Sequence, residues 1–208
     1  PREKGPPKGY VIFVFGFGPP KPAAECLQRA PSTSVQQVGG APIPVQLGYD
    51  FIEVDWCNPY DFLEQNGMVL RELIEETRPT LTATQTFFVG GTSMGGLISR
   101  YILTQLESEG FDHGVDVWMT SDAPLKGAYV PLSVLLLGEV AASSGFVDAG
   151  PLQPVIAAAN ANSARQMLLA YHVSQPPGRP HAEHVTFFDN LENLGSFPKS
   201  IDRTVAIA

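Results

Sequence analysis

Continuous apolar runs alternate with amphipathic stretches along the first 120 residues of the chain. The runs are short and rich in β-branched and aromatic residues, which is typical of strands buried on both faces of a parallel sheet. They occupy residues 10–15, 51–56, 86–89 and 115–120. Residues 60–77 have helical spacing and stop before Pro79, and a second helical pattern runs from Leu97 to Gly110. This alternation predicts an α/β fold, with a mostly parallel sheet and helices on both faces.

The last third of the chain has a weaker pattern. Residues 124–196 are irregular, with helix-like stretches at about 132–142 and 154–171. We interpret 1–9 as a linker and 10–208 as the folded core, in which 131–196 form a cap or lid; a packing subdomain is the alternative. A fifth apolar run, Arg203–Ile207, predicts a core strand at the end of the sequence, so we expect a fold that is incomplete at its C-terminus.

Composition and charge limit the classes of partner and ligand that fit this sequence. The 208 residues carry 13 Lys and Arg against 21 Asp and Glu, and this net charge of -8 argues against a nucleic-acid partner. The longest apolar run, 131–137, is too short to span a bilayer. The two cysteines, Cys26 and Cys57, lack zinc-site spacing, and a single bridge and two buried thiols fit them equally. We therefore expect no metal centre, no nucleic-acid partner and no membrane span.

The strongest chemical motif is Gly91-Thr92-Ser93-Met94-Gly95, which matches G-x-S-x-G between an apolar strand and an amphipathic helix. In that setting a sharp turn lifts the serine hydroxyl above the carboxyl edge of the sheet, and the flanking glycines avoid collisions with the neighbouring strand and helix. The helix N-terminus then favours the negative charge of a tetrahedral intermediate. The alternatives are a phosphate loop and a structural turn. Because no P-loop lysine and no G-x-G-x-x-G lies at Ser93, no cofactor is expected.

Three segments carry a resemblance to a known family: 89–103 (VGGTSMGGLISRYIL), the strand and loop VIFVFGFG, and SDAPLKGAYVPLS. The first resembles the elbow and following helix of lipase- and esterase-like α/β-hydrolases. The other two resemble segments of uncharacterised bacterial secreted hydrolases. Together they cover most of residues 10–135. The resemblance implies an α/β-hydrolase fold, Ser93 as the nucleophile, an acid and a histidine later in the chain, and export from the cytoplasm.

The loop Gly16-Phe17-Gly18, directly after the first strand, is the expected second half of an oxyanion hole. In the fold that the resemblance implies, this loop supplies one backbone N–H and the residue after the nucleophile supplies the other. The donors are then Phe17 and Met94. A simple turn that ends a strand is the alternative.

Asp122 is the candidate acid of a triad, because it lies just past the fourth strand, at the carboxyl edge where catalytic loops gather. The segment Ser-Asp-Ala-Pro is also similar to the acid-bearing turn of pancreatic-type lipases. An Asp that only caps the turn before Pro124 is the alternative, and in many relatives the acid instead follows the next strand.

The histidine of a triad is harder to place. His113 precedes the fourth strand, away from the site, and His172 lies at a helix end. His181 and His184 share a polar loop without a trusted ligand spacing. We take His184 as the candidate within the chain and expect the catalytic histidine to lie outside these residues.

The motif and the resemblance predict a carboxylic-ester hydrolase that forms an acyl-enzyme on Ser93 and acts on a small-molecule or lipid ester. The alternative from another class is a catalytically incomplete α/β-hydrolase-like module that binds or scaffolds. The intact G-x-S-x-G motif favours the enzyme, and the missing histidine favours the module.

Overall fold

The computed structural model describes residues 6–22, 26, 37–38, 41–133, 136, 140, 153–170 and 178–207, and all structural statements below concern these ranges. The expected linker at 1–9 and the helix-like stretch at about 132–142 therefore lie largely outside the described residues. Among the helices of the described ranges, none has the length and apolar character needed to cross a membrane.

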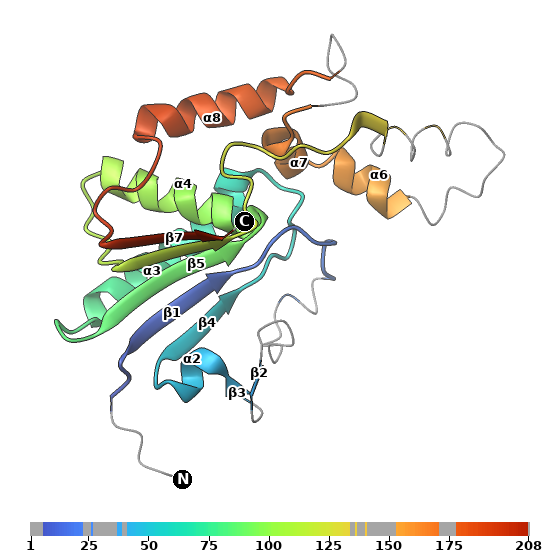
Figure 1. The fold of residues 1–208 in the computed structure, drawn as a ribbon. Coiled ribbons are helices and arrows are strands. Elements are labelled where there is room, and N and C mark those ends of the chain that lie inside the picture. Colours follow the sequence, from blue (N-terminus) through green and yellow to red (C-terminus); the bar gives the residue numbers. More distant parts are fainter. Residues whose placement is uncertain are drawn as a thin grey trace.

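Five parallel strands form the central sheet, in the order β4-β1-β5-β6-β7 (Figure 1). Their bounds are β1 Gly9–Val14, β4 Asp50–Val54, β5 Thr86–Thr92, β6 Val117–Ser121 and β7 Arg203–Ile207. Every pair of neighbours in this sheet is parallel, which confirms the predicted α/β class. A separate two-stranded antiparallel sheet is formed by β2 (Gln37–Val38) and β3 (Ala41–Pro42).

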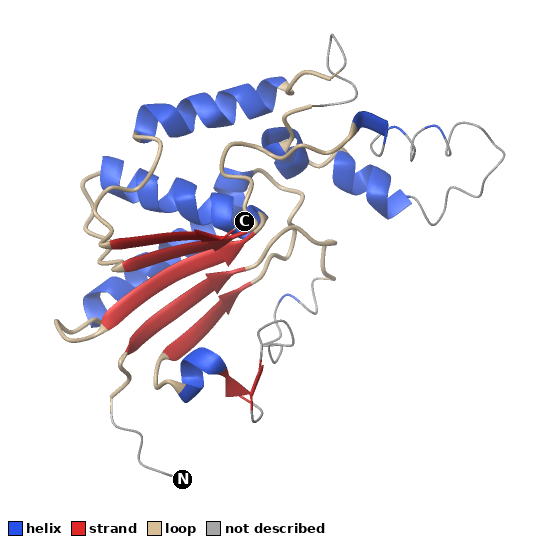
Figure 2. Cartoon of the chain, in the orientation of Figure 1, coloured by secondary structure: helices blue, strands red, loops and turns tan. Residues whose placement is uncertain are grey.

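The described helices are α2 Ile43–Gln46, α3 Leu63–Thr77, the 3-10 helix η1 Arg78–Thr80, α4 Met94–Ser108, α6 Gln153–Ala159, α7 Asn162–Met167 and α8 Ala182–Leu194. The long helices α3, α4 and α8 lie together on one face of the five-stranded sheet, and the short α2 lies apart from them, beside β4 (Figure 2). Helix α4 contacts β1, β5 and β6, and α3 and α8 pack against α4. On this face the apolar strand residues, such as Ile12, Val89 and Trp118, are almost fully buried. The indole N–H of Trp118 donates to Ser99 Oγ of α4 over 2.9 Å, which ties sheet to helix.

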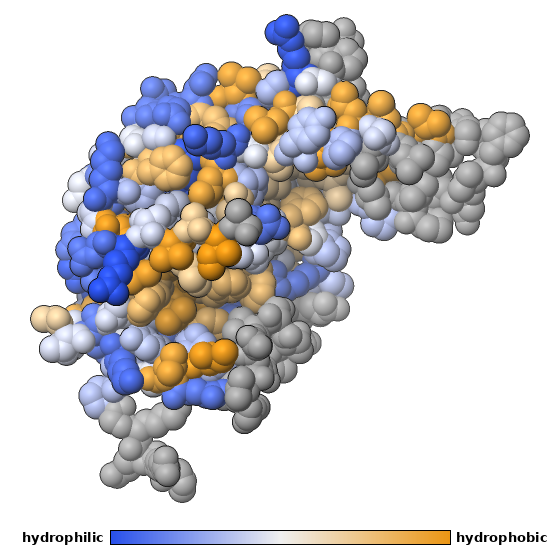
Figure 3. Space-filling model, viewed as in Figure 1, coloured by the Kyte–Doolittle hydropathy of each residue, from blue (hydrophilic) through white to orange (hydrophobic). Residues whose placement is uncertain are grey.

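The opposite face of the sheet is more open. Its side chains alternate with the buried set, as the period of a strand requires, and Val11 and Phe13 are only half-buried. Met119, Val205 and Ile207 are 41%, 43% and 54% exposed, and Figure 3 shows hydrophobic residues gathered over the strands. The sequence predicts helices on both faces of the sheet. In the described ranges, the long helices α3, α4 and α8 cover one of them.

Several element boundaries differ from the sequence-based prediction by a few residues, and the helix-like stretch at 154–171 forms two helices, α6 and α7. Two of the differences involve distant partners. Helix α3 begins at Leu63 instead of residue 60, since the Tyr60 carbonyl accepts hydrogen bonds from the N–H groups of Asn162 and Ser163. Strand β5 continues through Gly90–Thr92, which pair with β1 and β6 although glycine rarely favours a strand.

Candidate active site

Ser93 lies in the sharp turn between β5 and α4, with φ 51° and ψ -127°. A positive φ is uncommon for a residue with a side chain and stores backbone strain. The turn is held on both sides: the Ser93 N–H donates to the Ser121 carbonyl at 3.0 Å, and its own carbonyl accepts from Gly96 N–H at 3.0 Å. This arrangement projects the side chain from the carboxyl edge of the sheet.

Glycines at positions 91 and 95 permit the turn. A Cβ at Gly91 would lie 2.6 Å from the Gly95 carbonyl carbon, and one at Gly95 would lie 2.3 Å from the Val14 carbonyl oxygen. Both distances are well below contact distance and involve backbone atoms that cannot move aside. The collisions with strand and helix expected from the sequence motif are therefore present in the geometry.

The loop after β1 lies against this turn. A Cβ at Gly16 would be 2.8 Å from Ser93 Cβ, so only a glycine allows the approach. The loop is fixed by two hydrogen bonds of Phe15: its N–H donates to the Val54 carbonyl, and its carbonyl accepts the indole N–H of Trp56, each at 2.9 Å. The candidate donor Phe17 follows directly, and its ring stacks on Tyr60 with centroids 5.3 Å apart and planes 13° apart.

The two proposed oxyanion donors remain available. Met94 is the first residue of α4, where backbone N–H groups have no partner inside the helix. Within the described ranges, neither the Met94 N–H nor the Phe17 N–H donates a hydrogen bond to the protein. The assignment of these two groups to an oxyanion hole stays a prediction.

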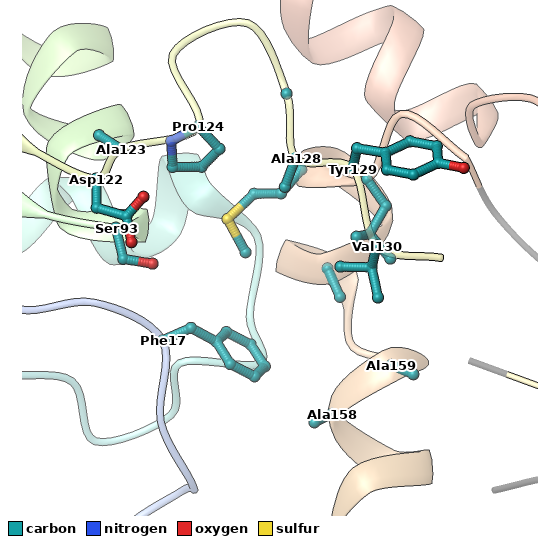
Figure 4. A pocket seen from close by; sticks show the side chains of 14 residues that line it. Phe17, Ser93, Asp122, Ala123, Pro124, Ala128, Tyr129, Val130, Ala158 and Ala159 are labelled. Carbon is teal, nitrogen blue, oxygen red and sulfur yellow. The ribbon is translucent and has the colours of Figure 1, made fainter. Parts of the chain in front are cut away.

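Asp122 lies next to Ser93 because the two residues end neighbouring strands at the same level. Thr92 of β5 pairs with Ser121 of β6, and each candidate is the following residue. Asp122 also has a positive φ, 47°, and its N–H donates to the Ile207 carbonyl at 2.7 Å. Figure 4 shows its exposed carboxylate and the Ser93 side chain on the same side of a cavity. No described residue donates a hydrogen bond to this carboxylate, so the alternative of a turn cap has no contact to support it there.

A cavity of about 630 Å³ opens at Ser93. Its walls come from Phe17, from the turn at 122–130 and from α6 and α7 (Figure 4). Apart from Ser93, Asp122 and the phenol of Tyr129, the lining side chains are apolar, and many of them are alanines. A predominantly apolar pocket with a few polar groups at one end is typical of sites for small organic ligands. The wall from α6 and α7 could not be predicted residue by residue, since alanines carry no chemical signal.

The structure does not bring His184 to Ser93. His184 lies in the helix α8, and the polar loop expected there from the sequence is wrong. The side chain is 7% exposed, and its Nδ1–H donates to the Gln166 carbonyl at 2.8 Å. Burial lowers its pKa below the ordinary value, and the hydrogen bond to Gln166 opposes this only in part. The ring lies behind the cavity wall: a Cβ at Gly127 would be 2.8 Å from its Cε1.

The other histidines do not complete the site either. His113 is buried beside Glu107 and Ser200 and precedes β6, at the far edge of the sheet. His181 caps the start of α8 by accepting the Glu183 N–H. His172 lies outside the described residues. Of the histidines that the structure describes, none forms a hydrogen bond with Ser93.

Metal and disulfide chemistry find no support in the described ranges. They contain no group of three or more His, Cys, Asp or Glu side chains that could hold a metal ion. Cys26 and Cys57 are not joined by a disulfide in this structure, and the alternative of two buried thiols is also wrong, because Cys57 is exposed and Cys26 is only partly buried.

Comparison with known families finds a match over the middle of the chain. The family model of lecithin:cholesterol acyltransferase matches residues 45–147, which is 103 of the 208 residues. The matched segment begins within α2, extends past the end of β6 and contains both Ser93 and Asp122. A search of curated proteins finds no match. The similarity and the parallel sheet together fit a hydrolase-like α/β fold.

Proposed function

We propose that the protein is a serine hydrolase that cleaves a carboxylic ester through an acyl-enzyme on Ser93. The observation that carries the proposal is the position of Ser93: a strained turn between β5 and α4, at the mouth of a largely apolar cavity. The similarity to an acyltransferase family supports the same class of chemistry. An apolar cavity of this size favours an ester with a hydrocarbon acyl group.

In the proposed reaction, Ser93 Oγ attacks the ester carbonyl carbon while a base takes the hydroxyl proton. The carbonyl oxygen gains negative charge, which the N–H groups of Phe17 and Met94 and the N-terminus of α4 stabilise. The C–O bond then breaks, the alcohol leaves with a proton, and the acyl group stays on Ser93. Water releases it as a carboxylate. Asp122 would orient the base, and the proposal assigns the base to no described histidine.

The test is covalent labelling with a fluorophosphonate, followed by mass spectrometry of the peptide that contains Ser93. We expect a single phosphonylated serine, at position 93, and no label on Ser93→Ala. A purified, folded protein that does not react would contradict the enzyme and favour the second candidate, a binding module. That candidate rests on the observation that no described histidine bonds to Ser93.

The acyl part of the proposal has its own test. For p-nitrophenyl esters of increasing chain length, kcat/KM should rise by about fourfold per methylene while the chain still enters the cavity, since each buried CH₂ contributes about 0.8 kcal/mol. A flat profile would place the acyl chain outside the cavity.

An added alcohol acceptor separates hydrolysis from acyl transfer, because the ester product can be measured directly. Export from the cytoplasm and a cap or lid role for 131–196 stay predictions.

A further inference from the structure

A charged side chain is buried behind the cavity wall. Arg100 lies in the middle of α4, seven residues after Ser93, and is 1% exposed. Burying an ionised group is costly unless its hydrogen bonds are satisfied. Arg100 does not line the cavity, so it has no direct part in the proposed chemistry. Its burial therefore calls for another physical reason.

The guanidinium of Arg100 binds two loops at once. One Nη donates to the Leu125 carbonyl, Nε donates to the Ser196 carbonyl at 2.6 Å, and the other Nη donates to Ser196 Oγ at 3.0 Å. The face of the group lies 3.7 Å from the ring centroid of Phe197. These partners are neutral, and four separate contacts hold the group in one orientation.

Ion pairing alone does not explain the burial. The nearest carboxylate partner is Glu192, whose Oε1 is 3.9 Å from an Nη and whose side chain is 65% exposed. A pair with so exposed a partner is strongly screened and weak. Consistent with this, burial lowers the pKa of Arg100 to about 10, and the opposing effect of Glu192 does not outweigh it. The main-chain carbonyls are thus the partners that matter.

The Leu125 carbonyl belongs to the turn that begins at Asp122. This turn forms one wall of the cavity through Asp122, Ala123, Pro124 and Gly127. Its first part packs on the start of α4, where a Cβ at Gly96 would be 2.5 Å from Ala123 Cβ. Its far part is held by Arg100, which comes from the same helix. Helix α4, which begins directly after Ser93, therefore contacts this wall at two points.

We propose that Arg100 is a positioning residue that fixes the turn 122–127 relative to Ser93, and so sets the reactivity of Ser93 through the placement of Asp122. This inference rests on the proposed function. An arginine suits the task because its planar group presents five N–H donors in a fixed fork. A lysine keeps the charge but cannot reach the carbonyls of both loops in one geometry.

The experiment compares Arg100→Lys with a matched control, Arg71→Lys. Arg71 also uses its fork, toward Glu75 and Glu109, but on the helical layer away from the cavity. We expect Arg100→Lys to lower the rate of fluorophosphonate labelling of Ser93 by about 10- to 100-fold, as small misplacements of reacting groups do. Arg71→Lys should keep the parent rate. Rates are divided by the folded fraction, taken from near-UV circular dichroism.

A double-mutant cycle separates positioning from a merely structural role. If Arg100 acts through Asp122, the loss from Arg100→Lys should largely disappear in an Asp122→Asn background, while the two losses of stability still add. Hydrogen exchange should also be faster in the peptide covering 122–128 of Arg100→Lys. If Arg100→Lys does not fold, Phe197→Leu, which removes only the stacked ring, should show the same two changes at smaller size.

The outcomes are distinguishable. A folded Arg100→Lys that is labelled at the parent rate, or one whose labelling loss is independent of Asp122, overturns the proposal. If the parent protein itself is not labelled at Ser93, the proposed function fails, and hydrogen exchange alone then decides whether Arg100 holds the turn. Unchanged exchange at 122–128 would refute that as well.

Discussion

Ser93 and Ser200 each lie beside a carboxylate, at opposite ends of the same sheet. Ser93 and Asp122 follow β5 and β6 at the carboxyl ends of the strands. Ser200 lies near the amino ends, where its hydroxyl donates to Glu107 Oε1 at 2.6 Å and lies 3.2 Å from His113 Nε2. By residue types alone, Ser200 with its histidine and carboxylate is the more complete triad.

The hydrogen bonds of the second cluster show why it cannot act as one. The Val115 N–H donates to His113 Nδ1 at 3.0 Å, so Nε2 is the nitrogen that carries the proton in the neutral ring. Nε2 then donates to Glu107 and cannot accept the proton of Ser200. The Ser93 hydroxyl, in contrast, has no hydrogen bond among the described residues and faces a cavity. The two serines therefore differ in the hydrogen bonding of their hydroxyl groups: that of Ser200 is bound to Glu107, and that of Ser93 can still be bound by a base or attack a substrate.

The most direct test of the difference between Ser93 and Ser200 is to remove each hydroxyl in turn. Ser93→Ala should lower kcat for a p-nitrophenyl ester by about a million-fold, the loss seen when a hydrolase loses its nucleophile. Ser200→Ala should leave kcat unchanged and lower the free energy of unfolding by about 1 to 3 kcal/mol, because it takes a hydrogen bond from a charged group. Equal activities of the two variants would contradict the assignment of Ser93.

The carboxylates provide a second test, with a control at the other end of the same strand. Asp122→Asn should lower kcat by about 100- to 10,000-fold, because an amide no longer stabilises a protonated base. Asp116 precedes β6, and its Oδ2 accepts the Phe87 N–H at 2.7 Å. Asp116→Asn should reduce stability without changing kcat. If Asp122→Asn keeps full activity, the acid lies elsewhere.

A third prediction concerns the backbone turn between β5 and α4 that exposes the Ser93 hydroxyl to the cavity. Gly95→Ala places a methyl group against the carbonyls of β1, so we expect a loss of at least about 1 to 3 kcal/mol of stability from overpacking and a large fall in labelling of Ser93. Gly18→Ala is the control for stability alone, since nothing lies within 4 Å of its Cβ but the residue belongs to the loop that carries the Phe17 donor. Thermal unfolding compares the stability of the two variants, and the labelling rate of Gly95→Ala is compared with that of the parent.

The smallest effect is expected in the second cluster and depends on pH. Burial favours the neutral form of Glu107, but hydrogen bonds from Ser200, Lys199 and His113 outweigh it and lower its pKa below the ordinary 4.5. As the pH falls, Glu107 of the unfolded chain therefore takes up a proton before Glu107 of the folded protein does. The contribution of Glu107 to stability is present above pH 4.5 and is lost as the pH falls through the lower pKa of the folded state. Urea titrations should show a steeper acid loss for the parent than for Glu107→Gln. Identical slopes would disprove the linkage.

Much of the fold follows from local pattern. The apolar runs predict the positions of β1, β4, β5, β6 and β7 within a few residues. They do not predict burial, because β7, which the sequence indicated as a core strand, is exposed along its whole length. Some of the boundaries that were missed depend on distant partners. The start of α3 is an example: the Leu63 N–H donates to Gln166 Oε1, a residue 103 positions away.

The candidate site, too, could be predicted only in part. The neighbourhood of Ser93 and Asp122 could be predicted, since parallel strands bring their carboxyl ends to one edge. The placement of His184 could not, because its Gln166 contact and the Gly127 wall arise from tertiary packing. Nor does any sequence pattern indicate that Arg100 reaches Leu125 and Ser196, since a lone arginine in an amphipathic helix is normally solvated.

The order of the strands also has a consequence for how fast the protein folds. The first strand of the chain, β1, lies inside the sheet and pairs with β4 at Tyr10 and Asp50 and with β5 at Gly9 and Thr86, so its two neighbours arrive 40 and 77 residues later. Contacts this distant in sequence slow folding, because the entropy of closing long loops is lost before the pairing compensates for it. Gly95, which packs on β1, can reach its position only after that closure. During refolding, helical circular dichroism should therefore recover before Ser93 regains its turn, and fluorophosphonate labelling should be the last signal to return.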